Sequence, residues 1–225
     1  PGHGDPAEDS HYTLPAVHHD RARLDSVELL PFKRYIYDGY AGVMTGHLYV
    51  PALDKARNKP VSMSRAVVTD LLQKELGFRG LCFTDALAMK GATTRKSDNP
   101  SVMALLAGND ILLAPTAPIN DFAAVKEALE EGILDREEIE VKIIKILQYK
   151  YIAGLNDYRP VETKGLSERL NSPHAAWLAA KLNEEAITLL KNEGDIIPLK
   201  QLDKKKIAAL SIGDGVGNEF QKMLG

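Results

Sequence analysis

Asp9 and His11 are separated by one serine in the first fifteen residues of the chain, a segment that also holds His3 and three prolines. In an extended segment, side chains two positions apart point the same way, so the spacing predicts that this carboxylate and imidazole meet. A carboxylate that accepts a proton from one ring nitrogen fixes the tautomer and stabilises the charged ring. The other nitrogen can then donate and retrieve a proton, which makes the pair a candidate acid–base dyad.

The same segment allows two other interpretations. Asp-x-His in a surface loop is typical of an Asx-type turn beside a solvated histidine. Imidazole and carboxylate groups also suit zinc or iron, and His3, Asp5, Asp9, His11, His18, His19 and Asp20 all lie within twenty residues. Their spacing matches no metal motif. We therefore expect no metal and no cofactor, and keep a metal-dependent hydrolase using the His3–Asp20 cluster as an alternative.

Asp85 closes a short apolar run and opens a long loop that extends to residue 99. In parallel α/β proteins, ligands bind at the carboxyl ends of the strands. A carboxylate at such an end would be held rigidly at the mouth of a site, which predicts a functional role. The alternative is that Asp85 simply caps the following turn.

His47 and Met89 are lesser candidates. His47 ends the preceding expected strand, where it can serve as a buried, hydrogen-bonded residue or contribute to binding. Met89 lies in the loop after Asp85, and its flexible side chain favours a role in packing or in a pocket wall. We assign both to substrate binding.

Strands and amphipathic helices alternate along the part of the chain that must position these groups, which is the signature of a parallel sheet covered by helices. The expected strands are 42–50, 80–84 and 110–114. The expected helices are 27–39, capped by Asp25 or Ser26; 65–76, capped by Ser64 and ended by Gly77; one beginning at Pro100; one through 122–132; and 136–152. We expect the three strands to be parallel and adjacent in that order, with right-handed crossovers.

The remainder of the chain reads as a separate domain. Residues 156–173 are polar and irregular and are interpreted as a linker. A long helix is expected at 174–191 and an apolar strand at 207–212. The sequence therefore predicts part of a barrel at residues 1–155, a linker at 156–173, and the first part of a second domain at 174–225.

Composition excludes several classes of function. Lys and Arg total 28 against 31 Asp and Glu, a net charge of −3, so nothing favours nucleic acid as a partner. Cys82 is the only cysteine, which excludes an internal disulfide. No apolar run approaches the roughly 20 residues that span a bilayer. The first residue is Pro1, so we expect the natural N-terminus, with any signal peptide or lipid anchor, to lie outside this sequence.

Three segments resemble glycoside hydrolase family 3, in its β-N-acetylglucosaminidase branch. PGHGDPAEDSHYTLP is similar to that branch's pattern K-H-F-P-G-H-G-D followed by D-S-H-x-x-L-P. FTDALAMKG resembles the segment that carries the family's nucleophile, and GVMTGHLYVP the preceding strand end. EEAITLLKNEGDIIPLK resembles the opening of the family's second domain.

The resemblance implies a fold and a set of roles. The fold class would be α/β: the C-terminal portion of a (β/α)8 TIM-type barrel, followed by the beginning of an α/β sandwich. By resemblance, Asp85 is the nucleophile, His11 the general acid/base, and Asp9 the residue that polarises it. A complete barrel needs about 250 residues, and the family's upstream sugar-binding residues would precede Pro1. The chain by itself is therefore expected to be an inactive fragment.

The implied activity is a retaining exo-β-N-acetylglucosaminidase acting on terminal β-linked N-acetylglucosamine in an oligosaccharide or muropeptide, in peptidoglycan turnover. A β-glucosidase-type or phosphorolytic member of the family remains an alternative, as does a sugar-binding module without turnover. The two-domain layout resembles exported members, which favours the bacterial envelope over the cytoplasm.

Overall fold

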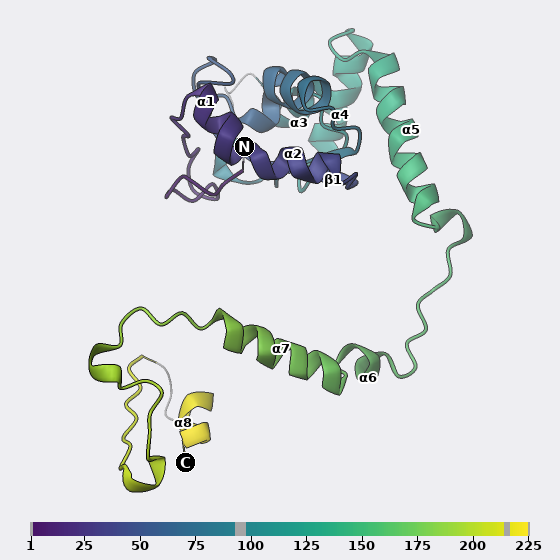
Figure 1. The fold of residues 1–225 in the computed structure, drawn as a ribbon. Helices are drawn as coiled ribbons and strands as arrows, with labels where there is room; N and C mark the ends of the chain where they lie inside the picture. Colours follow the sequence, from purple (N-terminus) through teal and green to yellow (C-terminus); the bar gives the residue numbers. More distant parts are fainter. Residues whose placement is uncertain (1, 93–97, 214–216, 225) are drawn as a thin grey trace. The chain divides into compact units, whose positions relative to one another are not determined.

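The chain forms two compact units, Pro1–Tyr158 (unit 1) and Arg159–Gly225 (unit 2). The structure is a computed structural model that describes residues 2–92, 98–213 and 217–224. Figure 1 follows the chain from its purple N-terminus to its yellow C-terminus. No helix among these residues is long and apolar enough to cross a membrane.

Unit 1 contains a small parallel sheet. Strand β1 (Gly42–Thr45) pairs in parallel with β2 (Leu81–Thr84), with Gly42 opposite Leu81 and Thr45 opposite Thr84. Ile111 continues the order through a parallel bridge to Phe83. The predicted parallel order is confirmed, and with it the α/β class, but the third predicted strand, 110–114, forms only this bridge and no regular strand.

The first predicted strand is shorter than expected. Regular pairing with β2 ends at Thr45, and the chain then bends before Tyr49 makes a separate parallel bridge to Ala16. In that bridge the Tyr49 N–H donates to the Pro15 carbonyl at 2.8 Å, and the Val17 N–H donates to the Tyr49 carbonyl at 2.8 Å. The bridge fixes the end of the loop that carries Asp9 and His11.

The first helical region begins earlier than predicted. Asp20 caps α1 (Arg21–Arg23), which runs through the π-helix η1 (Leu24–Glu28) into α2 (Leu30–Tyr37). Asp25 and Ser26, the predicted caps, have other partners because they already lie inside this region.

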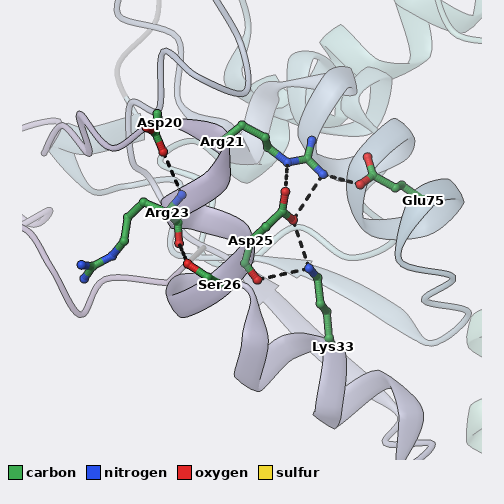
Figure 2. A network of polar contacts seen from close by, with 7 residues as sticks. All are labelled: Asp20, Arg21, Arg23, Asp25, Ser26, Lys33 and Glu75. Atoms are coloured by element: carbon green, nitrogen blue, oxygen red, sulfur yellow. Dashed lines mark hydrogen bonds and ion pairs between the residues drawn. The ribbon is translucent and has the colours of Figure 1, made fainter.

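Figure 2 shows what these residues do instead. Asp25 accepts hydrogen bonds from Arg21 Nε at 2.7 Å and from Lys33 Nζ at 3.0 Å. Arg21 also pairs with Glu75, which connects α1 to the helix that follows β1. The network therefore links α1 to α2 and to the helix that follows β1.

The helix after β1 is the π-helix η3 (Ala66–Glu75), ended by Gly77 at a φ of +75°. Its predicted apolar face is buried at Val67, Val68, Leu71 and Leu72. Ser64 does not cap it with its side chain, because the Ser64 hydroxyl donates to Asp54 while the Ser64 carbonyl accepts the first helical N–H groups.

Three further helices complete unit 1. They are α3 (Pro100–Ala107), capped by Asn99; α4 (Pro118–Glu130); and α5 (Arg136–Ile152), capped by Asp135. The helix beginning at Pro100 and the one at 136–152 were predicted and are confirmed. Short turns of 3₁₀-helix lie at Val61–Met63 (η2), Lys90–Ala92 (η4) and Leu155–Asp157 (η5).

The core of unit 1 consists of three apolar clusters. One joins the segment after the N-terminal loop to η1 and η3 and includes Val17, Leu24, Leu48 and Leu71. The second lies between the sheet and η3 and includes Val43, Val68 and Cys82. The third, with Met63, Leu87 and Ala104, lies under the segment that follows Asp85. Packing thus supports the chain segments that carry His47 and Asp85.

Unit 2 contains α6 (Leu166–Leu170), α7 (Pro173–Ala186) and α8 (Glu219–Leu224), with 3₁₀ turns at Glu193–Asp195 (η6) and Leu202–Lys204 (η7). Helix α7 ends at Ala186, not at 191 as predicted. The β-branched Ile187 and Thr188 disfavour helix there, and the Thr188 hydroxyl donates to the Ala186 carbonyl at 3.3 Å.

The predicted strand at 207–212 is irregular in the structure. Its apolar side chains are exposed, as at Leu210 and Ile212. A strand needs a neighbour to accept and donate its backbone hydrogen bonds, and no strand pairs with this segment among the residues the structure describes.

Candidate active site

The Asp9–His11 pair forms as predicted in its side chains, but on a different backbone. His11 Nδ1 and Asp9 Oδ1 are 2.7 Å apart, and the same oxygen accepts the His11 backbone N–H at 2.9 Å. The Asp9 carbonyl accepts the N–H groups of Tyr12 and Thr13, so the segment is a turn, not an extended chain. The Asx-type turn and the dyad, considered above as alternatives, occur together.

This geometry determines the protonation of the pair. A carboxylate only accepts, so His11 Nδ1 carries the shared proton, and Nε2 becomes the nitrogen that can exchange a proton with another molecule. Hydrogen bonds from the His11 backbone and then from its ring hold the pKa of the Asp9 carboxyl below its ordinary value. Asp9 therefore stays ionised. The His11 side chain is 69% exposed and accessible to a ligand.

Asp85 follows β2 directly, and its position is set by the sheet. Its backbone N–H donates to the Thr45 carbonyl at 2.9 Å, which extends the pairing with β1 by one residue. Its Oδ1 accepts the Ala86 N–H at 2.7 Å. The next residues are fixed on the other side, because Leu87 and Ala88 donate to the carbonyls of Leu113 and Ala114. Asp85 thus has a rigid backbone at the carboxyl edge of the sheet.

Asp85 also lines a largely apolar cavity of about 240 Å³. Residues from the N-terminal loop and from the end of β1 line the same cavity, among them His3, Thr45 and Gly46. The partly buried carboxylate therefore faces space that a ligand could occupy.

His47 is a buried residue with both ring nitrogens bonded inside the protein. Nε2 donates to the Ala86 carbonyl at 3.1 Å, and Nδ1 accepts from the Ser62 hydroxyl at 2.7 Å. Burial lowers the pKa of His47, outweighing the opposite effects of Ala86 and Asp85. The neutral ring holds the backbone next to Asp85 in place.

Met89 is half-buried in the same segment, and its N–H donates to the Ala86 carbonyl at 3.0 Å. Asp85, His47 and Met89 therefore all bond to the backbone of one residue, Ala86. Residues 93–97, in the predicted loop beyond them, lie outside the described residues.

The dyad turn and the segment after Asp85 are joined through their backbones. The Gly91 N–H donates to the Ser10 carbonyl at 3.2 Å, and the Lys90 N–H to the His11 carbonyl at 3.4 Å. A Cβ on Gly91 would lie 2.9 Å from the carbonyl oxygens of both Ser10 and Thr13, and 3.1 Å from the Cβ of His47. The absence of a side chain at Gly91 allows these segments to come together.

Three contributing residues were missed from the sequence: Ser62, Gly91 and Asn109. Asn109 is buried and donates to the carbonyls of Ser62 and Ala104, while its Oδ1 accepts from the Thr45 hydroxyl at 2.7 Å. Asn109 thereby connects the end of β1 to the segment that holds His47. An asparagine just before an expected buried strand was the available signal, because a buried amide needs several partners.

The proposed metal cluster does not assemble as a whole. His3 Nε2 donates to the Glu8 carbonyl at 2.8 Å, and His11 pairs with Asp9. Of the seven residues, Asp5 and His19 come together, with their ligand atoms close to those of Glu28, which lies outside the predicted cluster.

The sequence and fold of the chain are similar to those of one family of known proteins. Residues 1–149 match the family model described as "Glycosyl hydrolase family 3 N terminal domain". The chain is 33% identical over 237 residues to beta-hexosaminidase A of Pseudoalteromonas piscicida, covering 95% of this chain and 38% of that protein. It is 25% identical to a beta-N-acetylglucosaminidase/beta-glucosidase of Cellulomonas fimi, covering 82% of this chain and 34% of that protein.

Solved structures agree. A glycoside hydrolase family 3 beta-N-acetylglucosaminidase from Paenibacillus sp. str. FPU-7 superposes with a TM-score of 0.77 at 34% identity, covering 86% of this chain and 37% of that chain. Beta-glucoside phosphorylase BglX gives a TM-score of 0.80 at 24% identity, covering 88% and 38%, which is a likeness of fold alone. The chain spans little more than a third of the length of these relatives.

Proposed function

Because the chain belongs to glycosyl hydrolase family 3, we propose that it carries the catalytic residues of a retaining exo-β-N-acetylglucosaminidase. The observation that supports this most strongly is the hydrogen-bonded Asp9–His11 pair, on a turn whose backbone bonds to the segment after Asp85. The proposal is made for the complete protein, since the chain spans only part of its relatives.

Asp85 is proposed as the nucleophile. In the first step one Asp85 oxygen bonds to the anomeric carbon while the glycosidic carbon–oxygen bond breaks. His11 donates its Nε2 proton to the departing oxygen, and the Asp9 carboxylate stabilises the imidazolium that delivers it. A nucleophile needs a fixed position, and the backbone hydrogen bonds on both sides of Asp85 supply it.

The second step reverses the role of His11. The neutral imidazole takes a proton from water, the water oxygen bonds to the anomeric carbon, and the bond to Asp85 breaks. Two displacements at the same carbon give overall retention of configuration. Phosphate can replace water in principle, because histidine puts no negative charge beside the acceptor where a carboxylate would.

The substrate proposed is a terminal β-linked N-acetylglucosamine in an oligosaccharide or muropeptide, and the proposed role is peptidoglycan turnover in the bacterial envelope. The names of the hexosaminidase and N-acetylglucosaminidase relatives support the sugar class. His47 is proposed to contribute to binding indirectly, by fixing the Ala86 peptide, and Met89 as part of the wall. The proposed domain division is a barrel part at 1–155, a linker at 156–173, and the start of a sandwich domain at 174–225.

The test is a substrate comparison on the complete protein. Nitrophenyl β-N-acetylglucosaminide is expected to be cleaved far faster than nitrophenyl β-glucoside, and with or without phosphate the product is expected to be the free sugar. Asp85→Asn is expected to abolish turnover, whereas the matched change Asp70→Asn, at an exposed carboxylate paired with Lys74, leaves it intact. Preferential cleavage of the glucoside, or a sugar phosphate as product, would replace this proposal by one of the family alternatives.

A further inference from the structure

We propose that Asp5, His19 and Glu28 bind a zinc ion that holds the start of the N-terminal loop against helix η1, apart from the Asp9–His11 dyad. The three side chains come from separate places: Asp5 from the loop, His19 from the segment before α1, and Glu28 from the last residue of η1. One ligand atom from each lies within 4.8 Å of the others.

The separations suit a small cation. Zinc takes imidazole nitrogen and carboxylate oxygen at about 2.0–2.2 Å in tetrahedral geometry, so two ligands of one ion lie about 3.3–3.6 Å apart. His19 Nε2 and Asp5 Oδ2 are already 3.0 Å apart. A pair as far apart as the 4.8 Å limit would have to approach by about 1.2–1.5 Å, which the 40% exposed side chain of Asp5 can supply by rotation.

The burial of two of these atoms points to a missing partner. Glu28 Oε2 and His19 Nε2 are both shielded from solvent, and neither has a hydrogen-bond partner among the described residues. The Glu28 side chain is nine-tenths buried, at 10% exposure. An unpartnered buried carboxylate oxygen is costly, and a cation between it and the imidazole would satisfy both atoms at once.

The contact between His19 and Asp5 does not remove this requirement. Their atoms are close enough for an ion pair, but the ring nitrogen makes no hydrogen bond with the carboxylate in this orientation. An imidazole nitrogen and two carboxylate oxygens that converge in this way are ligands that zinc accepts.

The surroundings provide charge balance and a route of entry. Arg23 Nε donates to Glu28 Oε1 at 3.1 Å, which orients the carboxylate and leaves Oε2 directed to the site, as a supporting hydrogen bond does for a metal ligand. Asp5 and Glu28 also line a surface hollow of about 410 Å³. An ion can therefore reach the site from solvent.

Such an ion would be structural. It would connect Asp5, which lies four residues before the dyad, to η1. The first residue of η1, Leu24, and the residue after η1, Leu29, both lie in the core. Zinc is therefore expected to stabilise the fold of the loop, while no proton transfer in the proposed reaction passes through it.

The test uses the complete protein, stripped with a chelator, dialysed, and titrated calorimetrically with zinc chloride alone. One equivalent is expected to bind and to raise the melting temperature. Loss of even an outer-sphere partner of a metal ligand weakens binding by about 10–100-fold, so Asp5→Asn and Glu28→Gln are each expected to weaken it at least that much. His18→Gln is the matched control, because the exposed His18 is adjacent to His19 in sequence, and is expected to bind zinc as the wild type does.

A second control separates this site from the dyad. His11→Gln is expected to retain the equivalent of zinc, because His11 contacts Asp9 and not Asp5. Absence of zinc binding, unchanged affinity in Asp5→Asn, or loss of binding in His11→Gln would each overturn the proposal. If Glu28→Gln does not fold, Asp5→Asn decides the matter, since the exposed Asp5 side chain is not part of the core.

Discussion

His11 is held by two hydrogen bonds to a single Asp9 oxygen, one from its ring and one from its backbone. The sequence predicted the partners correctly but placed them on extended chain. Side-chain spacing alone could not distinguish an extended segment from a turn. In a turn, an aspartate that accepts the N–H of the residue two positions on can also reach the ring of that residue. The turn also leaves the His11 ring exposed, and a group that exchanges protons with a substrate must be exposed.

The proposed acid role of His11 makes its importance depend on the leaving group. General acid catalysis contributes about 10²–10⁴-fold when a poor leaving group departs, and a nitrophenolate needs little such help. In the complete protein, His11→Ala is expected to slow the cleavage of natural disaccharides by that factor. The first step with nitrophenyl substrates, transfer of the sugar to the enzyme, is expected to slow much less. Steady-state and pre-steady-state rates on both substrates check this.

With the nitrophenyl substrate, the second step of His11→Ala should become limiting, so the glycosyl-enzyme accumulates and added azide restores turnover. Equal losses on both substrates without azide rescue would make His11 a structural residue.

His47 predicts a pH effect on stability. Burial holds the pKa of His47 in the folded protein below the ordinary value of 6.5. At a pH between the folded-state pKa and the ordinary value, His47 is protonated in the unfolded chain and neutral in the folded one. Stability is therefore expected to fall as the pH decreases below about 6.5. His47→Gln is expected to lower the free energy of unfolding at pH 7 but to flatten its slope between pH 7 and 5, in denaturant titrations. An unchanged slope would show that other groups cause the acid sensitivity.

At the scale of elements, the candidate site depends on how closely two loops approach. The sequence predicted a long loop after Asp85, and its contact with the dyad turn could not be read from it, because that contact is made by backbone groups at Lys90 and Gly91. Backbone contacts have no residue-type signature except where a glycine is required, as at Gly91.

Gly91→Ala tests this approach. The added methyl would lie 2.9 Å from two carbonyl oxygens, so one of the loops must move. Overpacking of this kind costs about 1–3 kcal/mol of stability, and displacement of the dyad is expected to lower activity of the complete protein by about 10²-fold. Gly39→Ala is a control, since its Cβ would meet nothing within 4 Å, although its φ of +78° costs some stability. Full activity in Gly91→Ala would show that the loops act independently.

Helix α5 illustrates a second limit of the sequence. Its pattern predicted an apolar face at Ile139, Ile143, Ile146 and Leu147, yet Ile143 and Leu147 are about half exposed. The helix is attached to the sheet through a polar contact: Lys145 Nζ lies 2.8 Å from the buried Asp110 carboxylate, which also accepts the Cys82 N–H. Periodicity detects apolar faces but gives no indication of a single buried ion pair.

Breaking this pair predicts a loss of stability. Lys145→Met removes the ion-pair partner of Asp110, whose side chain is 1% exposed, and breaking a buried pair costs up to about 3–5 kcal/mol. Lys150→Met, at an exposed position on the same helix, is expected to change the free energy of unfolding by no more than about 0.5 kcal/mol. Chemical denaturation measures both. Equal effects would show that the contact contributes nothing specific.

At the scale of the whole chain, the two units differ in how well the sequence predicted them. In unit 1 the order of the parallel strands and the positions of most helices followed from apolar periodicity. The apolar faces that form the core of unit 1 all belong to the same stretch of chain, so the sequence shows them as regular patterns. In unit 2 the strand at 207–212 did not form, and the apolar residues there are exposed. The same pattern cannot specify a strand unless a neighbour is available to pair with it.

The central claim is that Asp85 is the nucleophile, and covalent trapping tests it most directly. The complete protein would be incubated with an activated fluorinated N-acetylglucosaminide, which forms the glycosyl-enzyme faster than it hydrolyses, and then digested and sequenced by mass spectrometry. We predict one sugar per protein, attached to the peptide containing Asp85, and no labelling in Asp85→Asn. A label on any other carboxylate, or turnover without a trapped intermediate in a protein that cleaves the parent substrate, would contradict the account.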